Sequence, residues 1–210
     1  MYFPRIAASA VLLVATATAT GTGCRFGPRE VRGVEAPDVD RKLSTFAYIE
    51  EGELVTFIVD VKATRDRGEQ AYIPLEVSVA NRGLRRLPLT RESFVLMDEE
   101  GNRFPLASPR ELLESYPMLD LDRRYSEIES IVFNKFHTFT RYQSRFSPTR
   151  SMNPNGSNLV VDRVTLPRAG YLIDWLYFPM PPGGIEGKRF DLFLSSPALE
   201  DPVFVKFRVR

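Results

Sequence analysis

The chain of 210 residues carries 28 Lys and Arg against 27 Asp and Glu, and it contains a single cysteine. This nearly neutral balance argues against a nucleic-acid-binding protein, which normally has a strong basic surplus. A single cysteine has no partner for an internal disulfide, so a hydrophobic core must stabilise the fold. The length is sufficient for one domain with such a core.

The first 23 residues have the pattern of an export signal. Arg5 supplies a positive charge, and residues 6–19 form a short apolar stretch followed by small residues. This stretch suits a signal peptide better than a transmembrane helix, which needs about 20 apolar residues.

The run Thr22-Gly23-Cys24 resembles the lipobox of bacterial lipoproteins, with Gly21 where leucine is usual. The resemblance implies cleavage before Cys24 and attachment of fatty acids such as palmitate to its sulfur. The predicted partner of Cys24 is therefore a lipid bilayer. The alternative is an ordinary secretory signal followed by a chance cysteine.

Residues 24–40 are expected to form a flexible tether, because they mix Gly, Pro and charged residues without a sustained period. Such a tether spans roughly 20–25 Å. Arg25 follows the cysteine, and no Asp retention signal of the enterobacterial kind stands there. By resemblance to that sorting rule, the periplasmic side of the outer membrane is favoured in a cell with two membranes.

Apolar residues alternate with other residues at 55–61 and 73–80, which predicts two strands with one buried and one outward face. Pro74 cannot donate a hydrogen bond to a neighbouring strand, so its strand is expected to start at a sheet edge or to carry a bulge. Residues 93–97 and 103–106 then flank a tight turn, in which Gly101 is free to take a positive φ.

A helical pattern follows. Ser108 before Pro109 is typical of a helix N-cap, and it predicts a short helix over 109–115. Apolar residues at helical spacing predict a longer helix over about 121–135. Residues 136–146 fit either a helix or a strand, and 147–158 are expected to form a polar loop.

Strand patterns return at 159–166, 171–178, 190–195 and 203–209. Many short strands separated by turn signals predict a mainly β fold, a β-sandwich with a helical insertion at about 109–146. Alternation within the strands predicts a shared buried core. That core is expected to include Val77, Val79, Phe94, Leu96, Trp175, Phe190, Leu192, Val205 and Phe207.

Three motifs occur in a recognisable order: Val77–Gly83 (VSVANRG), Phe94–Gly101 (FVLMDEEG) and Gly170–Pro179 (GYLIDWLYFP). In this order they resemble the immunoglobulin-like β-sandwich domains of bacterial lipoproteins of unknown function. The resemblance covers residues 53–210 except the helical insertion. It implies a single immunoglobulin-like domain at 41–210, and it predicts fold rather than activity.

Residues for catalysis or metal binding are few. His137 is the only histidine and lies among aromatic residues, and a partly buried or surface histidine on the insertion is favoured over a member of a catalytic triad. Asp98–Asn102 lacks the loop pattern of an EF-hand calcium site, so a solvated turn is favoured. Gly183 and Gly184 lack the Lys-Ser/Thr that completes a phosphate loop. We therefore expect no catalytic residue, metal or cofactor.

Arg141, Tyr142 and Arg145 are candidate partner-binding residues, because Arg and Tyr are frequent at interfaces. With Arg123 and Arg124 they are alternatively expected to face anionic lipid headgroups, or to belong to a surface whose aromatic residues pack inward.

Two functions remain open from the sequence. The first is a non-catalytic, membrane-anchored module that binds an envelope protein or glycan, or has a structural role. The second is an envelope enzyme that uses carboxylates, such as a glycan hydrolase, which needs two carboxyl groups across a cleft.

Overall fold

The computed structural model describes residues 34–35, 47–150 and 160–209, all within the compact unit Val31–Arg210. Strands hold 43% of these residues and helices 19%, which confirms the prediction of a mainly β fold. None of the described helices is long and apolar enough to span a membrane. The predicted signal peptide and Cys24 lie outside the described residues.

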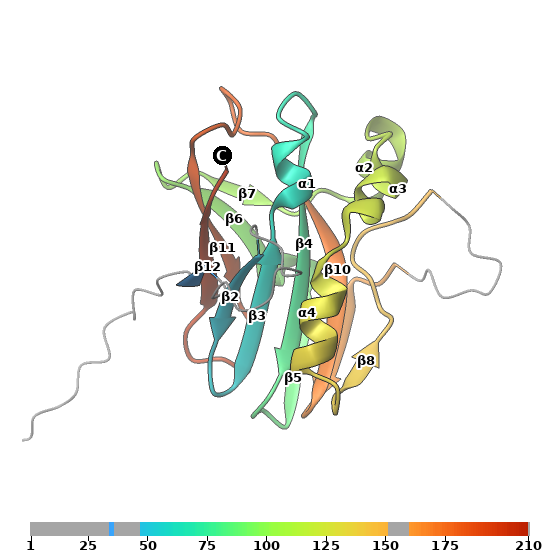
Figure 1. Cartoon of the computed structure of the whole chain (residues 1–210), viewed down its shortest axis with the longest axis vertical. Coiled ribbons are helices and arrows are strands. Elements are labelled where there is room, and N and C mark those ends of the chain that lie inside the picture. Colours follow the sequence, from blue (N-terminus) through green and yellow to red (C-terminus); the bar gives the residue numbers. More distant parts are fainter. Residues whose placement is uncertain (1–33, 36–46, 151–159, 210) are drawn as a thin grey trace, which may run out of the picture. The chain divides into compact units, whose positions relative to one another are not determined.

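The largest sheet has six strands (Figure 1). Its order is β1 (Val34–Glu35), β2 (Ala47–Glu51), β3 (Val55–Asp60), β4 (Tyr72–Asn81), β10 (Gly170–Pro179) and β8 (Thr140–Tyr142). Neighbouring strands are antiparallel except β8, which runs parallel to β10. The two ten-residue strands β4 and β10 pair along their whole length and form the centre of this sheet.

A second sheet has four strands, and a two-stranded ribbon accompanies it. The order in the second sheet is β12 (Val203–Arg208), β11 (Arg189–Leu194), β6 (Phe94–Asp98) and β7 (Arg103–Pro105). The ribbon pairs β5 (Arg86–Thr90) with β9 (Arg163–Pro167). The turn between β6 and β7 contains Gly101 with φ 85°, which confirms the predicted hairpin.

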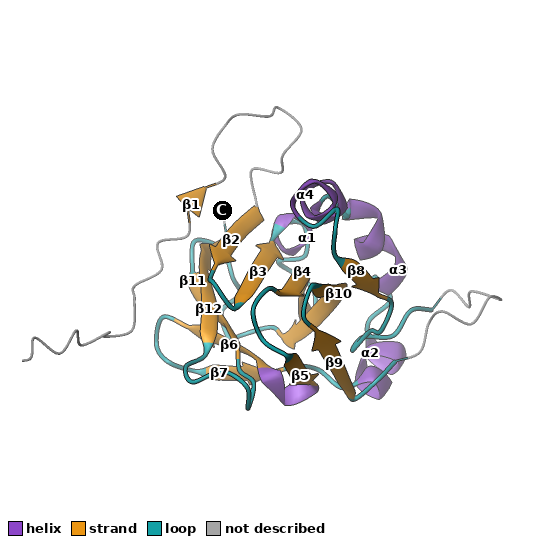
Figure 2. Ribbon diagram, turned by 90° about the horizontal axis from the view of Figure 1, so that it is seen from below, coloured by secondary structure: helices purple, strands orange, loops and turns teal. Residues whose placement is uncertain are grey.

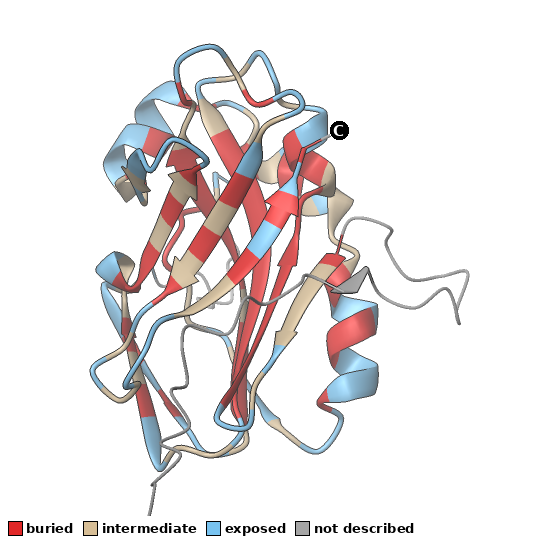
Figure 3. Cartoon of the chain, turned by 90° about the vertical axis from the view of Figure 1, so that its left-hand side faces the viewer, coloured by how far each residue is buried: buried red, intermediate tan, exposed pale blue. Residues whose placement is uncertain are grey.

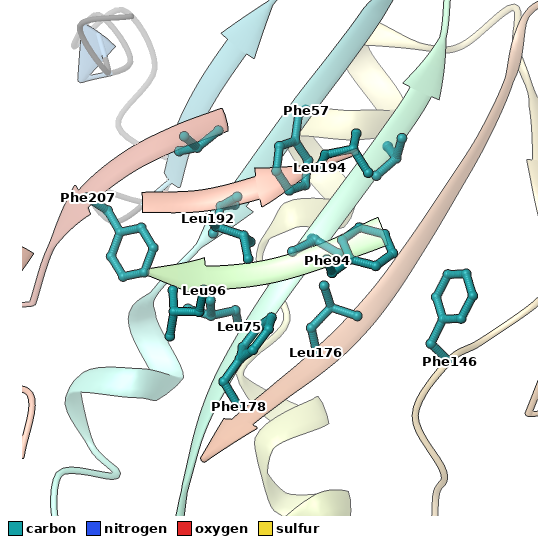
Figure 4. Packing of buried hydrophobic residues seen from close by; sticks show 14 of the residues in the cluster. Phe57, Leu75, Phe94, Leu96, Phe146, Leu176, Phe178, Leu192, Leu194 and Phe207 are labelled. Atoms are coloured by element: carbon teal, nitrogen blue, oxygen red, sulfur yellow. The ribbon is translucent and has the colours of Figure 1, made fainter. Parts of the chain in front are cut away.

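The main core lies between the two large sheets. Its side chains come from β3, β4 and β10 on one side and from β6, β11 and β12 on the other. Figure 4 shows Leu75 and Leu176 from the first sheet close to Leu96 and Phe94 from the second. All the residues predicted for the core are buried, and all except Trp175 belong to this cluster.

Helices cover the opposite face of the six-stranded sheet (Figure 2). They are α1 (Lys62–Arg65), α2 (Pro109–Ser115), α3 (Leu119–Asp122), the 3-10 turn η2 (Arg123–Tyr125) and α4 (Ile128–Lys135). A further 3-10 turn, η1 (Arg91–Ser93), precedes β6. Most of the helix therefore falls within 109–146, as predicted.

This cover corrects the prediction that alternate residues of β3 and β4 face outward. Every residue of β3 is buried, and so is every residue of β4 after Tyr72 (Figure 3). Ile58 and Ala80 pack with Ile128 and Val132 of α4 in a second apolar cluster. The strands are therefore buried on both faces because a helical layer replaces solvent on one of them.

Pro74 does not mark a sheet edge, because β4 lies between β3 and β10. Pairing with β3 ends at Glu76, so Pro74 lies beyond that neighbour and needs no hydrogen-bond donor on this side. On that side the hydroxyl of Thr64, a residue of α1, donates a hydrogen bond to the Pro74 carbonyl.

Trp175 is buried beneath the helices rather than between the sheets. It packs in a third cluster with Leu112 of α2, Leu119 of α3 and Tyr177 of β10. The alternation of β10 explains this position, because odd-numbered residues face the helices while Leu172 and Leu176 face the main core.

The prediction of one continuous helix over 121–135 is wrong. It is divided into α3, η2 and α4, and Leu121 is 40% exposed. The break falls at Ser126–Glu127, where the Ser126 hydroxyl bonds the buried Glu76 carboxylate instead of continuing a helix.

Other segments also differ from the predicted ones. Residues 140–142 of the ambiguous segment form β8, and the predicted strand at 159–166 is found as β9, at 163–167. Strands β2 and β5 were not predicted. Within the predicted tether, Val34–Glu35 pair with β2, and the rest of that tether and residues 151–158 of the predicted loop lie outside the described residues.

Candidate binding site

The three predicted interface residues have different neighbours. Arg141 donates to the Glu129 carboxylate of α4 at 2.7 Å, whereas Tyr142, the next residue of β8, packs against the main core. Burial lowers the pKa of Arg145, which lies within electrostatic reach of Arg123 and Asp174. The side chains therefore do not gather into one exposed patch.

Hydrogen bonds with Arg91 and Asp174 fix the two ends of the helical insertion. The Arg91 guanidinium donates to the Ala107 carbonyl before α2 and to the Phe146 carbonyl after β8. The buried Asp174 carboxylate accepts from the Phe146 amide, and burial raises the pKa of Asp174 to about 6. Arg91 thus binds the chain at both ends of the insertion, and Asp174 adds a second contact at the end after β8.

A buried polar network organises the far end of the helical layer. The Asp122 carboxylate of α3 accepts from Arg67 Nε at 2.8 Å and from the Tyr116 hydroxyl at 2.7 Å. Burial raises the pKa of Asp122, and these two hydrogen bonds oppose that shift. Burial and Asp122 also raise the pKa of Tyr116, so its phenol stays protonated and donates.

This network positions Arg67 in a cleft of about 380 Å³, lined by Arg67, Met118, Leu121, Arg124 and Tyr125. We call it the Arg67 cleft. The guanidinium carbon of Arg67 lies 5.4 Å from the centre of the Tyr125 ring, a cation–π arrangement. The lining combines two cations with an aromatic ring and two apolar side chains, and it contains no carboxylate.

Arg123 and Arg124 are adjacent but serve different places. Arg123 has a buried Nε, and its positive charge lowers the pKa of Asp174. Arg124 is exposed and lines the Arg67 cleft. No described residue forms an ion pair or a hydrogen bond with the Arg124 side chain. Arg124 is therefore the arginine of this pair that is available to a ligand.

A pair of buried acids lies elsewhere, beneath α4. Asp60 of β3 and Glu76 of β4 are directly opposite in the sheet register, and both are buried. Glu76 accepts from the Ser126 hydroxyl and from the Ile128 amide, at the start of α4. Burial raises the pKa of Glu76 to about 7, and Asp60 adds to the shift.

The remaining predicted positions are at the surface or in turns. His137 is exposed after α4, with Nδ1 3.4 Å from the Asn134 carbonyl. The Asp98 carboxylate accepts the amides of Glu100 and Asn102, which closes the β6–β7 turn. Among the described residues, no group of three or more His, Cys, Asp or Glu is arranged to hold a metal ion.

Sequence reasoning missed Arg67, although it identified Arg124. Arg67 is separated by 55 residues from Asp122, and only the fold brings the two together. No pattern in the sequence points to the cleft, because Leu121 and Tyr125 keep the helical spacing of the apolar residues that follow them, and only the structure shows that they line it.

The sequence matches no protein-family model and no curated protein. Among solved structures, the chain is similar to the crystal structure of a "putative lipoprotein", YcdA, from Bacillus subtilis. The sequences are 12% identical, the TM-score is 0.39, and the match covers 77% of this chain and 38% of that one. The chain therefore spans little more than a third of that protein, and a likeness this distant carries no argument about fold or function.

Proposed function

We propose that this protein is a lipid-anchored, non-catalytic binding module of the bacterial cell envelope. It is exported, cleaved before Cys24 and held on the membrane by fatty acids on that cysteine. In a cell with two membranes, its place is the periplasmic side of the outer membrane. The small residues that precede Cys24 support the anchor.

The module is proposed to be an immunoglobulin-like β-sandwich, and the strand order supports this assignment. Strands β3, β4 and β10 are neighbours in one sheet, as A, B and E are in that fold. Strands β6, β11 and β12 are neighbours in the other sheet, as C, F and G are. The helical insertion then falls between the C and E strands.

The observation that carries the binding function is the Arg67 cleft. Arg, Tyr and Met are enriched at binding surfaces, and three of the five lining residues are Arg or Tyr. The hydrogen bonds from Arg67 and Tyr116 to Asp122 hold one wall in place before any ligand arrives. Such preorganisation reduces the entropic cost of binding.

The geometry gives no comparable support to a carboxylate-dependent hydrolase. That chemistry needs two carboxyl groups that face a shared cleft. Asp60 and Glu76 are paired but lie buried beneath the start of α4, and neither lines the Arg67 cleft. We therefore propose binding rather than catalysis.

Site-specific photo-crosslinking in intact cells tests the proposal. A photoreactive amino acid replaces Leu121, which lines the cleft and is 40% exposed. The matched control places it at Leu54, which is 45% exposed in the β2–β3 turn. We expect a discrete adduct from position 121 that is missing from position 54. Equal adducts at both positions, or none at 121, would exclude the cleft as the binding site.

A further inference from the structure

We infer that the Arg67 cleft binds a singly charged oxyanion that carries an apolar group, such as an organic carboxylate or a phosphodiester. This inference rests on the proposed function, because it names the class of ligand for the same site. A phosphodiester comes either from a soluble compound or from the headgroup of an anionic lipid, and the chemistry of recognition is shared.

The charge of the cleft favours a single negative charge. Arg67 contributes one guanidinium, but its Nε lies 2.8 Å from the Asp122 carboxylate, whose negative charge compensates most of it. Arg124 contributes a second guanidinium, for which the described residues supply no acidic partner. The uncompensated charge is therefore about that of one arginine, which a monoanion neutralises.

The donors of the cleft suit an oxyanion. Arg67 uses Nε for Asp122 and Nη1 for the Asp66 carbonyl, and it also interacts with the Tyr116 hydroxyl, which leaves part of its five N–H groups for a ligand. Arg124 is exposed and lines the cleft, and no described residue accepts a hydrogen bond from its guanidinium. Arginine presents a planar set of N–H groups that matches carboxylate and phosphate oxygens, so both residues can donate to one bound group.

The other lining residues suit an apolar substituent. Met118 and Leu121 supply apolar side chains, and Tyr125 adds an aromatic ring with Arg67 over one of its faces. Leu121 is 40% exposed, which leaves apolar area for a ligand to cover. The volume of about 380 Å³ is at the lower end of the usual range for small-molecule sites, about 300–1,000 Å³.

Direct binding of small probes tests the inference. The full chain is reconstituted in phosphatidylcholine vesicles and dialysed against radiolabelled hexanoate or diethyl phosphate, with protein-free vesicles as the blank. Acetate lacks the apolar group, and hexanol lacks the charge. We expect both labelled anions to bind, acetate to bind more weakly, and hexanol not to bind measurably.

Matched arginine variants identify the donor. Arg124→Gln keeps a polar side chain but removes the charge, and we expect hexanoate affinity to fall about tenfold or more. Arg110→Gln is the control, because Arg110 lies on α2 in the same helical layer, forms an ion pair with Glu114, and does not line the cleft. We expect the control to bind hexanoate as the wild type does.

Changing the lipid composition of the vesicles distinguishes a soluble anion from a lipid headgroup. Replacing part of the phosphatidylcholine with phosphatidylglycerol reduces hexanoate binding if a lipid headgroup enters the cleft, and leaves it unchanged if the ligand is soluble. Hexanol that binds as tightly as hexanoate, or an Arg124→Gln variant with unchanged affinity, would overturn the inference. In that case a crosslink at position 121 would show that the cleft still binds a partner of another class, whereas its absence would remove the proposed function as well.

Discussion

Among single residues, Glu76 is the one whose protonation we expect to make the attachment of the helical layer depend on pH. Its carboxylate receives hydrogen bonds from Ser126 and Ile128 at the start of α4, while Asp60 lies opposite and Glu129 adds negative charge. The pKa of Glu76 rises from 4.5 to about 7 on folding, chiefly because the carboxylate is buried. The folded protein therefore holds this proton over a range in which the unfolded chain has lost it.

This shift predicts that the Glu76 contribution to stability is present below pH 4.5 and is lost as pH rises to about 7. The full change corresponds to about 3 kcal/mol at about 1.4 kcal/mol per pKa unit. Glu76→Gln cannot ionise, so its free energy of unfolding should lack this fall. Urea unfolding at a series of pH values measures it. Glu69→Gln, at an exposed position, should keep the wild-type profile, and a Glu76→Gln profile parallel to the wild type would refute the assignment.

Trp175 gives a second prediction at this scale. Its side chain is 4% exposed and packs with Leu112, Leu119 and Tyr177 under the helices. Trp175→Ala leaves a cavity and should lower the free energy of unfolding by about 3–5 kcal/mol. Urea unfolding followed by circular dichroism measures the change. A midpoint that hardly moves would mean that Trp175 is not packed in this cluster.

At the scale of elements, the first turn of α2 depends on a reciprocal cap. The Ser108 hydroxyl accepts the Glu111 amide at 3.2 Å, and the Glu111 carboxylate accepts the Ser108 amide at 2.9 Å. Ser108→Ala removes the first of these and should cost about 1 kcal/mol of unfolding free energy. Ser108→Thr keeps a hydroxyl and should recover most of the loss in the same unfolding assay. If alanine and threonine behave alike, the cap does not stabilise the helix.

Elements with strong local signals could be predicted from the sequence. The cap at Ser108 fixed the bounds of α2, and Gly101 located the β6–β7 hairpin. Strand β5 could not be predicted, because Pro88 interrupts a short segment with only two buried residues, Leu87 and Leu89. The outer faces of β3 and β4 were misjudged because alternation reports one buried face and does not show which element covers the other.

At the scale of the whole domain, the site was the least predictable feature. Arg67 belongs to a segment after α1 without a regular pattern, and Arg124 belongs to the insertion. Arg67 reaches the cleft because its Nε bonds the buried Asp122, and that contact depends on how the insertion packs over the sheet. Sequence spacing holds no information about such a contact, although it indicated the insertion itself.

We propose that a lipid on Cys24 holds this binding module on a membrane, and fatty-acid labelling tests that anchor. Cells that express the chain are labelled with radioactive palmitate, and the membrane fraction is examined for the wild type and for Cys24→Ser. We expect a labelled, cleaved wild-type protein in the membrane fraction and a Cys24→Ser protein without label, either uncut or soluble. A wild-type protein that takes up no label while remaining in the membrane would refute the lipid anchor.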